Sequence, residues 1–366
     1  MKKGIGILMM MVLFALTACG SFEQAPAPTQ TAEPVAEMGT LDTIVEDTQE
    51  FITLTYFDAA GTAQEVSVVQ SPTTVAIFDW GILDILYTIG WENTGIERLI
   101  IPTNALPSEI DWFTSQDFVI TGGTLHYVNW DVLDLVQPEL VILGTRSFAH
   151  NAAGETTSPE ARTELRAEAD EKYPDTAFIR LTQNSTRSHL MEDLTHNVHV
   201  LQQIFPQIAD ELQAYLDHSV DALNNLREKV QESEATALFV MLWEDRMSIF
   251  LPDGRFHMVY DEFGFLPAAY DLPEWGDQHG FDARAEFILS VDPDVILLLD
   301  RTDMDSPNGG VGVQNFMADS IIQSTTAAGE GHIYVLQGNQ WYTLLGGLGA
   351  LDIMIANVMM FVDTLG

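Results

Sequence analysis

The chain has 366 residues, of which 46% are hydrophobic, and its 54 acidic and 15 basic side chains give a net charge of −39. This length suffices for one large hydrophobic core or two medium ones, and the apolar content excludes general disorder. So negative a surface argues against nucleic acids and anionic membranes as electrostatic partners. An arginine held at a strand end in this background is expected to have an anionic partner of its own.

The N-terminus has the pattern of a lipoprotein signal. Lys2 and Lys3 precede an apolar run at 4–15, which has the length of a signal-peptide core and is too short for a spanning helix. The sequence Leu-Thr-Ala-Cys that ends at Cys19 resembles a bacterial lipobox. We therefore predict a signal peptide at 1–18 and a protein tethered to the outer face of the cell membrane by lipid on Cys19.

Cys19 is also the single cysteine of the chain, which excludes disulfides, thiol catalysis and cysteine-bound metal in the mature protein. Residues 19–50 are rich in Pro, Ala, Thr, Gln and Glu and have no sustained apolar period. This composition is typical of a flexible linker between lipid and fold.

Residues 51–205 alternate strand and helix patterns, which predicts an α/β lobe with a mainly parallel sheet. Strands are expected at 51–57, 65–69, 73–78, 96–101, 118–121, 138–143 and 177–181. Helices are expected at 80–89, 129–136 and 161–172.

The segment 186–232 reads as helical throughout, with one break at Pro206. After the break, apolar residues recur at spacings of three and four from Ile208 to Val230, which predicts one helix of about 25 residues. We expect this helix, at 206–233, to be the rigid connection between two lobes.

Strand and helix alternate again over 234–366, which predicts a second α/β lobe. Strands are expected at 237–243, 247–251, 295–299 and 332–336. Helices are expected at 256–263, 286–290, 313–324 and 348–363. The predicted fold is thus α/β, with two lobes of mainly parallel sheets joined by a single long helix.

An internal repeat supports the two-lobed reading. Residues 131–146 and 286–301 align without gaps: an acid, a Val, a Pro followed by an acid, an aliphatic strand and a final arginine fall in register. The arginines are Arg146 and Arg301, and ligands of open parallel sheets bind at the carboxyl ends of strands. The repeat predicts two similar lobes, each of which presents an arginine to the cleft between them.

These features resemble the helical-backbone class, class III, of substrate-binding lipoproteins of ABC importers, and most closely its ferric-siderophore binders of the catecholate subgroup. The resemblance runs from about residue 50 to the end of the chain. It is carried by the sequences at 75–84, 137–142, 254–256, 276–280, 300–301 and 340–342.

The resemblance implies five cleft residues. Arg146, Arg255 and Arg301 match arginines that bind anionic catecholate oxygens, while His279 and Tyr342 match residues that reach iron directly when the siderophore leaves coordination sites free. The chemistry is suitable, because guanidinium groups bind planar anions in a bidentate manner and Fe³⁺ accepts phenolate oxygen and imidazole. The acidity of the chain and the Thr343-Leu344-Leu345 that follows Tyr342 depart from the subgroup.

The resemblance further implies a monomer without an intrinsic cofactor or enzymatic activity, which carries a ferric siderophore to an ABC permease dimer with its ATPase. Asp131 and Glu286 match the acids, one in each lobe, that dock on the permease, although acids are also favoured at any helix start.

Three kinds of alternative remain open. Haem, corrinoid and hydroxamate-siderophore binding belong to the same fold, but three cleft arginines favour a polyanion. A surface-anchored hydrolase lacks support, because the sequence has no Gly-x-Ser-x-Gly, phosphate-loop or His-Glu-x-x-His motif. A zinc or manganese binder needs convergent His and carboxylate side chains, and surface helical positions are the simpler reading of His189, His196 and His199.

Overall fold

The structure, a computed structural model, describes residues 49–57, 63–181, 190–244, 246–270, 281–282, 284–306 and 308–365. Several features predicted from the sequence lie outside these residues: the signal peptide 1–18, Cys19, most of the linker, His189 and the loop that carries His279. Among the helices described, none combines the length and the apolar character that crossing a membrane requires.

The N-terminal sheet has five parallel strands in the order β5-β4-β3-β8-β9. Its strands are β3 Thr74–Phe78, β4 Arg98–Ile101, β5 Val119–Thr121, β8 Leu140–Leu143 and β9 Ala177–Arg180. Its helices are α1 Trp80–Thr88, α2 Trp130–Val136 and α3 Pro159–Lys172. The smaller elements are the antiparallel pair β1 Phe51–Phe57 and β2 Ala63–Val69, the pair β6 Gly123–Thr124 and β7 Tyr127–Val128, and the 3-10 turns η1 Trp91–Asn93 and η2 Ser108–Ser115.

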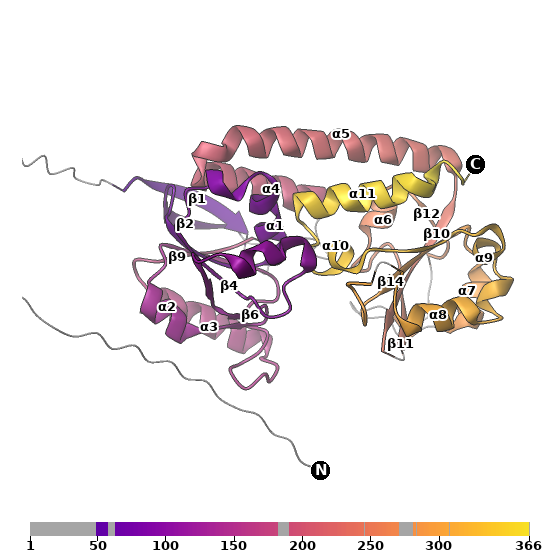
Figure 1. The fold of residues 1–366 in the computed structure, drawn as a ribbon, viewed down its shortest axis with the longest axis horizontal. Coiled ribbons are helices and arrows are strands. Elements are labelled where there is room, and N and C mark those ends of the chain that lie inside the picture. Colours follow the sequence, from indigo (N-terminus) through magenta and orange to yellow (C-terminus); the bar gives the residue numbers. More distant parts are fainter. Residues whose placement is uncertain are drawn as a thin grey trace, which may run out of the picture. The chain divides into compact units, whose positions relative to one another are not determined.

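Two antiparallel helices follow, α4 Leu190–Ile204 and α5 Ala209–Ser233, separated by the 3-10 turn η3 at Pro206–Ile208. The break therefore lies at the predicted proline, where a residue without an N–H is best tolerated at a helix start. α5 is a single helix of 25 residues, which buries Leu212, Leu216, Leu223, Leu226 and Val230 on one face. It runs along both sheets with the C-terminal helix α11 beside it (Figure 1).

The C-terminal sheet is mixed, with strand order β13-β11-β10-β14-β15 and β12 paired to β10. Its strands are β10 Thr236–Trp243, β11 Arg246–Phe250, β12 Leu266–Pro267, β13 Phe281–Asp282, β14 Val295–Asp300 and β15 Ile333–Val335. β14 is parallel to β10 and β15, whereas β11 is antiparallel to its neighbours. Its helices are α6 Met258–Asp261, α7 Ala285–Val291, α8 Val311–Ala318, the 3-10 turn η4 Ile322–Ser324, α9 Thr326–Glu330, α10 Gly338–Tyr342 and α11 Leu348–Val362.

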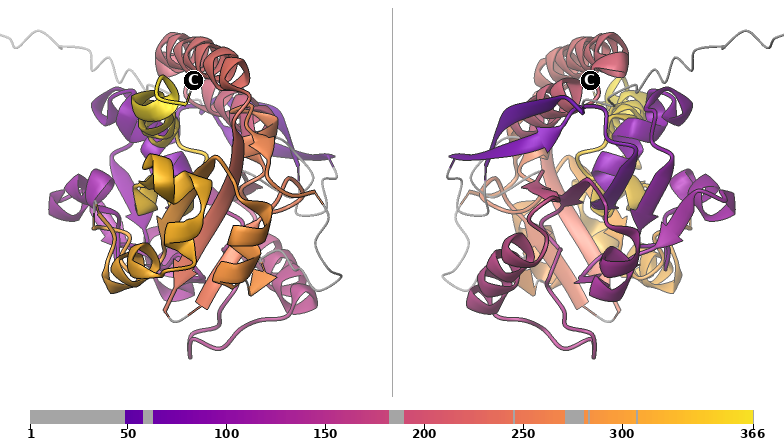
Figure 2. Two further views of the ribbon diagram at one scale, coloured as in Figure 1. Left: turned by 90° about the vertical axis from the view of Figure 1, so that its right-hand side faces the viewer. Right: turned by 90° about the vertical axis from the view of Figure 1, so that its left-hand side faces the viewer.

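Alternation along the central strands explains how both sheets share one core. Val75 and Ile77 of β3 join the same apolar cluster as Leu297 of β14, together with α1, α4, α5 and α11. The intervening residues, such as Phe78 and Leu298, face separate clusters closed by α2 and α3 in one lobe and by α7 and α8 in the other. This period of two is the side-chain period of a strand. The central face of each sheet therefore packs on the same helices, which Figure 2 shows from both ends.

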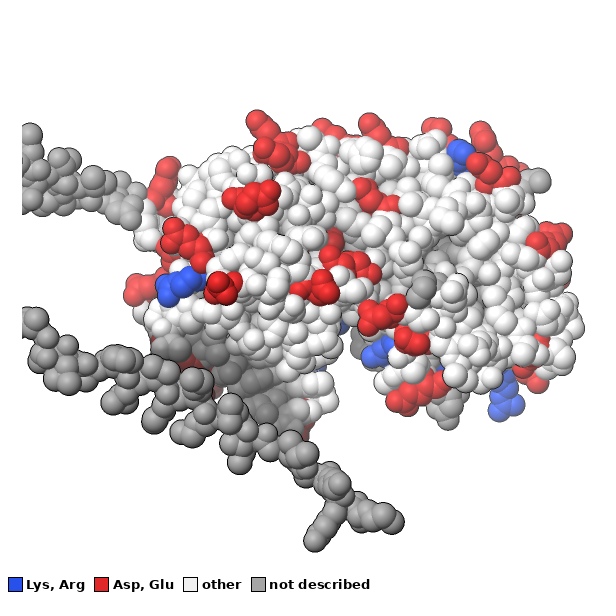
Figure 3. Space-filling view, viewed as in Figure 1, with Lys and Arg blue, Asp and Glu red and all other residues white. Residues whose placement is uncertain are grey.

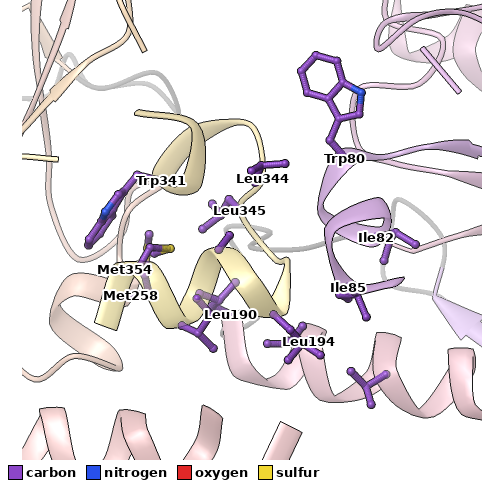
Figure 4. Close-up of a cluster of buried hydrophobic side chains, with 14 of the residues drawn as sticks. Trp80, Ile82, Ile85, Leu190, Leu194, Met258, Trp341, Leu344, Leu345 and Met354 are labelled. Atoms are coloured by element: carbon purple, nitrogen blue, oxygen red, sulfur yellow. The ribbon is translucent and has the colours of Figure 1, made fainter. Parts of the chain in front are cut away.

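Figure 4 shows part of this shared core, where α10 meets α11 and the N-terminal helices. Trp341 is fully buried and packs edge-on against Phe263, while Leu344 and Leu345 fill the space between α10 and the helices α1, α4 and α11. Burying such side chains contributes roughly 1.5–3 kcal/mol each. The core thus anchors the segment that immediately adjoins Tyr342.

The predicted internal repeat is present as two matching helix–strand units, α2–β8 and α7–β14. Each helix has an acid in its first turn and ends at a residue in the left-handed conformation, Gln137 with φ of 52° and Asp292 with φ of 42°. In the N-terminal sheet, β8 lies beside β3 in parallel register, and in the C-terminal sheet β14 lies beside β10 in the same way.

Candidate anion-binding site

Two predicted site arginines follow the carboxyl ends of parallel strands. β8 ends at Leu143, and Arg146 comes after a tight turn in which the Gly144 N–H donates to the Ser147 hydroxyl at 3.0 Å. Gly144 is required there, because a Cβ at this position would collide with the carboxylate of Asp79. β14 ends at Asp300, and Arg301 follows directly, its backbone N–H donating to the Leu242 carbonyl at 2.8 Å.

The third arginine, Arg255, comes from the turn between β11 and α6. The turn is fixed by hydrogen bonds from the Gly254 N–H to the Leu251 carbonyl, at 2.8 Å, and from the His257 N–H to the Gly254 carbonyl, at 3.1 Å. Phe256 is completely buried and stacks on Phe239 at 4.0 Å between ring centroids. Burial of its neighbour therefore holds Arg255, itself partly exposed, at the site.

Tyr342, the last residue of α10, brings the three arginines together. Its backbone carbonyl accepts hydrogen bonds from Arg146 Nη2 at 2.9 Å and from Arg255 Nη2 at 3.1 Å. Its ring contacts all three guanidinium groups, with Cζ of Arg255, Arg301 and Arg146 at 4.0, 4.8 and 5.5 Å from the ring centroid. Tyr342 therefore contacts Arg146 of the N-terminal lobe as well as Arg255 and Arg301 of the C-terminal lobe.

Aromatic rings alternate with guanidinium groups across this site. Arg301 Cζ lies 4.0 Å from the Trp243 ring, and Arg255 Cζ lies 5.7 Å from the Phe256 ring. With Tyr342 in the middle, the order is Trp243, Arg301, Tyr342, Arg255, Phe256, which we call the aromatic column. The negative face of an aromatic ring attracts a cation, so these contacts offset repulsion among the arginines.

Two of the three arginine charges, those of Arg146 and Arg301, are not neutralised by acids of the described chain. Among the described residues, neither Arg146 nor Arg301 forms an ion pair. Burial lowers the pKa of Arg255 to about 10, and the positive charges of Arg146 and Arg301 add to that effect. Acidic side chains are instead scattered over the outer surface, as Figure 3 shows for one face. A local positive site is therefore set in a strongly negative protein.

Two histidines adjoin the site in the N-terminal lobe. The rings of His126 and His150 stack at 4.8 Å between centroids, and the His150 N–H donates to the His126 carbonyl at 2.9 Å. Burial lowers the pKa of His126 to about 4, with further lowering by the charges of His150, Arg146, Arg162 and Arg301. The field of the arginines thus reaches His126 and adds to the effect of burial, which keeps the imidazole neutral into the acidic range.

α10 is held by acids from both lobes. Glu109, in η2, accepts hydrogen bonds from Asn339 Nδ2 at 3.1 Å and from Gln340 Nε2 at 2.7 Å. Asn339 Nδ2 also donates to Asp305 at 2.7 Å. Asn339 and Gln340 therefore both have fixed partners, which holds α10 in place and with it the Tyr342 carbonyl.

The structure brings Arg146, Arg255, Arg301 and Tyr342 together, while His279 lies outside the described residues. Asp131 and Glu286 lie elsewhere, exposed in the first turns of α2 and α7. Sequence reasoning missed Trp243, His126 and His150. The sequence did contain a signal for Trp243, because this residue ends the predicted strand at 237–243, just as Arg301 lies beyond the end of the predicted strand at 295–299.

No group of three or more His, Cys, Asp or Glu side chains is arranged to hold a metal ion within the part of the chain that the structure describes. His196 and His199 lie on α4, and burial lowers the pKa of His196. The phenol oxygen of Tyr342 belongs to the ring that the three guanidinium groups contact. Guanidinium groups gathered around an aromatic ring are chemically suited to a multiply charged anion with aromatic rings.

Comparison with known proteins identifies the family. A family model described as "Periplasmic binding protein" matches residues 75–339, a segment that spans both sheets and the helix between them. The chain belongs to this family. Proteins of the family bind substrates, which agrees with the prediction that the chain is not an enzyme.

Two curated relatives cover most of this periplasmic binding protein. The petrobactin-binding protein YclQ of Bacillus subtilis (strain 168) is 24% identical over 296 residues, which cover 80% of this chain and 83% of YclQ. The ferric-anguibactin-binding protein FatB of Vibrio anguillarum is 21% identical over 293 residues, which cover 79% of this chain and 82% of FatB.

Solved structures confirm the predicted fold class. The crystal structure of YclQ matches with a TM-score of 0.69 at 23% identity, covering 87% of this chain and 99% of that one. The periplasmic catecholate-siderophore binding protein VctP of Vibrio cholerae matches with a TM-score of 0.67 at 20% identity, covering 84% and 100%. The α/β fold with two lobes is therefore that of a periplasmic binding protein.

Proposed function

We propose that this periplasmic binding protein captures a ferric siderophore of the catecholate class between its lobes and delivers it to an ABC importer. The observation that carries this proposal is the gathering of Arg146, Arg255 and Arg301 around Tyr342, with no acid paired to Arg146 or Arg301 among the described residues. Relatives named for petrobactin, ferric anguibactin and catecholate siderophores support it.

The chemistry of the ligand fits the site. A ferric tris-catecholate carries about three negative charges on oxygens at the edges of aromatic rings, which suits guanidinium hydrogen bonding and stacking together. In the structure, Arg146 and Arg255 donate to a neutral carbonyl, that of Tyr342. Charge-assisted hydrogen bonds to an anion are roughly twice as strong as bonds to a neutral acceptor, so catecholate oxygens compete well for these donors.

The remaining assignments belong to the same proposal. Tyr342 and His279 serve as iron ligands when the siderophore leaves coordination sites open. Asp131 and Glu286 dock the two lobes on the permease dimer. Residues 1–18 are the signal peptide, Cys19 carries the lipid, and 19–50 link the anchor to lobes at 51–205 and 234–366, joined by the helix at 206–233. The protein acts as a monomer.

Calorimetric titration against a panel of ferric siderophores tests this function. We expect submicromolar affinity for bis- and tris-catecholate complexes and far weaker binding of ferric hydroxamates, haem and corrinoids. Arg255→Gln should weaken catecholate binding by about ten- to a hundredfold, since it removes a charge-assisted contact. Arg98→Gln is the matched control, because Arg98 is exposed and donates to Thr74 Oγ1 in the N-terminal sheet. Equal affinity for catecholates and hydroxamates would disprove the proposed specificity.

The iron ligands are tested by absorption spectroscopy. Tyr342→Phe should remove a charge-transfer contribution from a tetradentate ferric complex, which leaves two coordination sites open, and hardly alter a hexadentate one. An unchanged tetradentate spectrum would exclude Tyr342 from the iron. Phe preserves the ring that the three arginines contact, so the arrangement of guanidinium groups is expected to persist.

A further inference from the structure

Arg301 differs from the other two site arginines in what holds it. Its guanidinium lies between the rings of Trp243, at 4.0 Å, and Tyr342, at 4.8 Å. Within the described part of the chain, this guanidinium forms neither a hydrogen bond nor an ion pair. By contrast, Arg146 and Arg255 both donate to the Tyr342 carbonyl. Aromatic contacts are therefore what orients Arg301.

The register of the C-terminal sheet places Trp243 beside Arg301. Leu242 of β10 pairs with Asp300 of β14 in parallel register, so Trp243, which ends β10, and Arg301, which follows β14, lie side by side at the same end of the sheet. Two hydrogen bonds fix this end of the sheet: the Arg301 N–H donates to the Leu242 carbonyl at 2.8 Å, and the Glu244 N–H donates to Thr302 Oγ1 at 2.6 Å.

An aromatic face and a carboxylate hold an arginine in different ways. A carboxylate binds the N–H groups in the guanidinium plane and cancels the charge. A ring binds the flat face of the guanidinium and leaves those N–H groups available. Trp243 is 39% exposed, so the indole is not simply a core residue that happens to touch Arg301.

We propose that Trp243 is a positioning residue, which holds Arg301 by its flat face so that its in-plane N–H groups and its full charge remain available to an anionic ligand. This inference rests on the proposed function for the identity of the ligand, a ferric catecholate. Trp243, at the end of β10, is an additional site residue that the internal repeat carrying Arg146 and Arg301 does not indicate.

The aromatic column explains why the effect should be specific to Arg301. Arg255 contacts two rings, those of Tyr342 and Phe256, and donates a hydrogen bond to the Tyr342 carbonyl. Loss of Trp243 leaves those contacts in place. Arg301, however, keeps only the Tyr342 ring, at the longer of its two ring distances. The side chain then gains rotational freedom that ligand binding must remove again.

A double-mutant cycle tests the proposal with Trp243→Leu, Arg301→Gln and the double variant. The probe is a synthetic hexadentate tris-catecholate loaded with iron(III), and calorimetry is the readout because Trp243 itself contributes fluorescence. We expect Trp243→Leu to weaken binding about tenfold, Trp243→Phe to restore most of the loss, and the double variant to bind no more weakly than Arg301→Gln. Trp112→Leu is the matched control, since Trp112 is 37% exposed and packs on Tyr87, Phe113 and Phe118.

Three outcomes overturn the inference while leaving the proposed function standing. They are wild-type affinity for Trp243→Leu, an equal loss with and without Arg301, which would indicate direct contact between indole and ligand, and no recovery with Phe. A second measurement needs no ligand: the heteronuclear NOE of the Arg301 Nε–H resonance should show a rigid side chain in the wild type and a mobile one in Trp243→Leu. Failure of the probe to bind the wild type refutes the proposed function, and the NOE then decides the positioning role by itself.

Discussion

The carboxylates of Glu139 and Asp294 occupy matching positions in the two sheets, and each accepts hydrogen bonds from the first residues of the neighbouring strand. Glu139 Oε2 accepts from the N–H groups of Thr73 and Thr74, at 2.7 and 3.0 Å. Asp294 Oδ2 accepts from the N–H and the hydroxyl of Thr236, at 2.8 and 2.6 Å. The acid after the proline of the repeat therefore sets the register of a central strand in each lobe.

Removal of either acid should destabilise the fold. Glu139→Ala and Asp294→Ala each leave partly buried backbone donors without a charged acceptor, and we expect a loss of about 1.5–3 kcal/mol in the free energy of unfolding. Urea denaturation followed by circular dichroism measures it. Asp253→Ala, at an exposed turn position, is the control and should change stability by no more than about 0.5 kcal/mol. Losses as small as that in both repeat variants would show that the acids do not hold the strands.

Asp84 should make stability depend on pH. Burial raises its pKa from 3.8 to about 7, and the charges of Glu109 and Asp352 raise it further, against hydrogen bonds from the Ala350 and Gly349 N–H groups. The folded state therefore binds this proton more tightly than the unfolded state. Stability is highest below the unfolded pKa and falls as pH rises from about 4 to about 7.

Asp84→Asn removes the titrating group but keeps an oxygen acceptor for the Ala350 N–H. The variant should lose this pH dependence and, above the folded pKa, unfold with a free energy about 2–4 kcal/mol higher than that of the wild type. Urea denaturation at a series of pH values across the window measures both effects. Parallel profiles for the two proteins would show that Asp84 does not titrate there.

Gly347 permits Asp84 to reach the start of α11. A Cβ at Gly347 would collide with the Asp84 carboxylate, so Gly347→Ala should cost about 1–3 kcal/mol of stability. Gly329→Ala is the control, because no atom lies within 4 Å of the position that its Cβ would take in α9. That change should be neutral or stabilising by up to about 1 kcal/mol. Equal effects of the two substitutions, measured by thermal denaturation, would contradict the close packing at Gly347.

The electrostatic field of the site can be measured at His126. Because the positive charge of Arg146 contributes to the lowering of the His126 pKa to about 4, Arg146→Gln should move that pKa upward, toward the ordinary value of 6.5. A bound polyanion should do the same in the wild type, since it offsets the charges of Arg146, Arg162 and Arg301. NMR titration of the imidazole carbon-bound protons gives the pKa directly. A lower or unchanged value in Arg146→Gln would contradict a common field.

Much of the fold follows from local patterns. β3 is recognised by a short run of five residues, apolar except for the opening Thr74, as in a strand buried on both faces. α5 is recognised by apolar residues at spacings of three and four, which place them on one face of a helix. The pairing of Arg146 with Arg301 also follows from the repeat, since equal spacing from a proline sets the same strand end. Short elements were harder: α10 has only five residues, and no period can be read over such a length.

The site needed tertiary information beyond these patterns. Arg146 and Arg255 are more than a hundred residues apart in the sequence. The contact of all three arginines with Tyr342 depends on how the shared core positions α10. His126 and His150 come from irregular loops, where the sequence fixes no spacing that predicts stacking. Trp243 is the last residue of the mostly buried strand β10, and its exposure depends on where the neighbouring strand β14 stops.

The position of Tyr342 at the end of α10 has a consequence for how occupancy of the site can be detected. α11 follows within a few residues and packs against α1 of one lobe and the long helix α5, where the hydroxyl of Ser219 donates to Asp352 at 3.3 Å. We therefore expect a ligand that displaces the Tyr342 carbonyl to affect α11 as well, through the short connection between α10 and α11. Amide exchange in α11 should report binding, and by thermodynamic reciprocity a substitution that loosens α11 should alter affinity without touching the ligand.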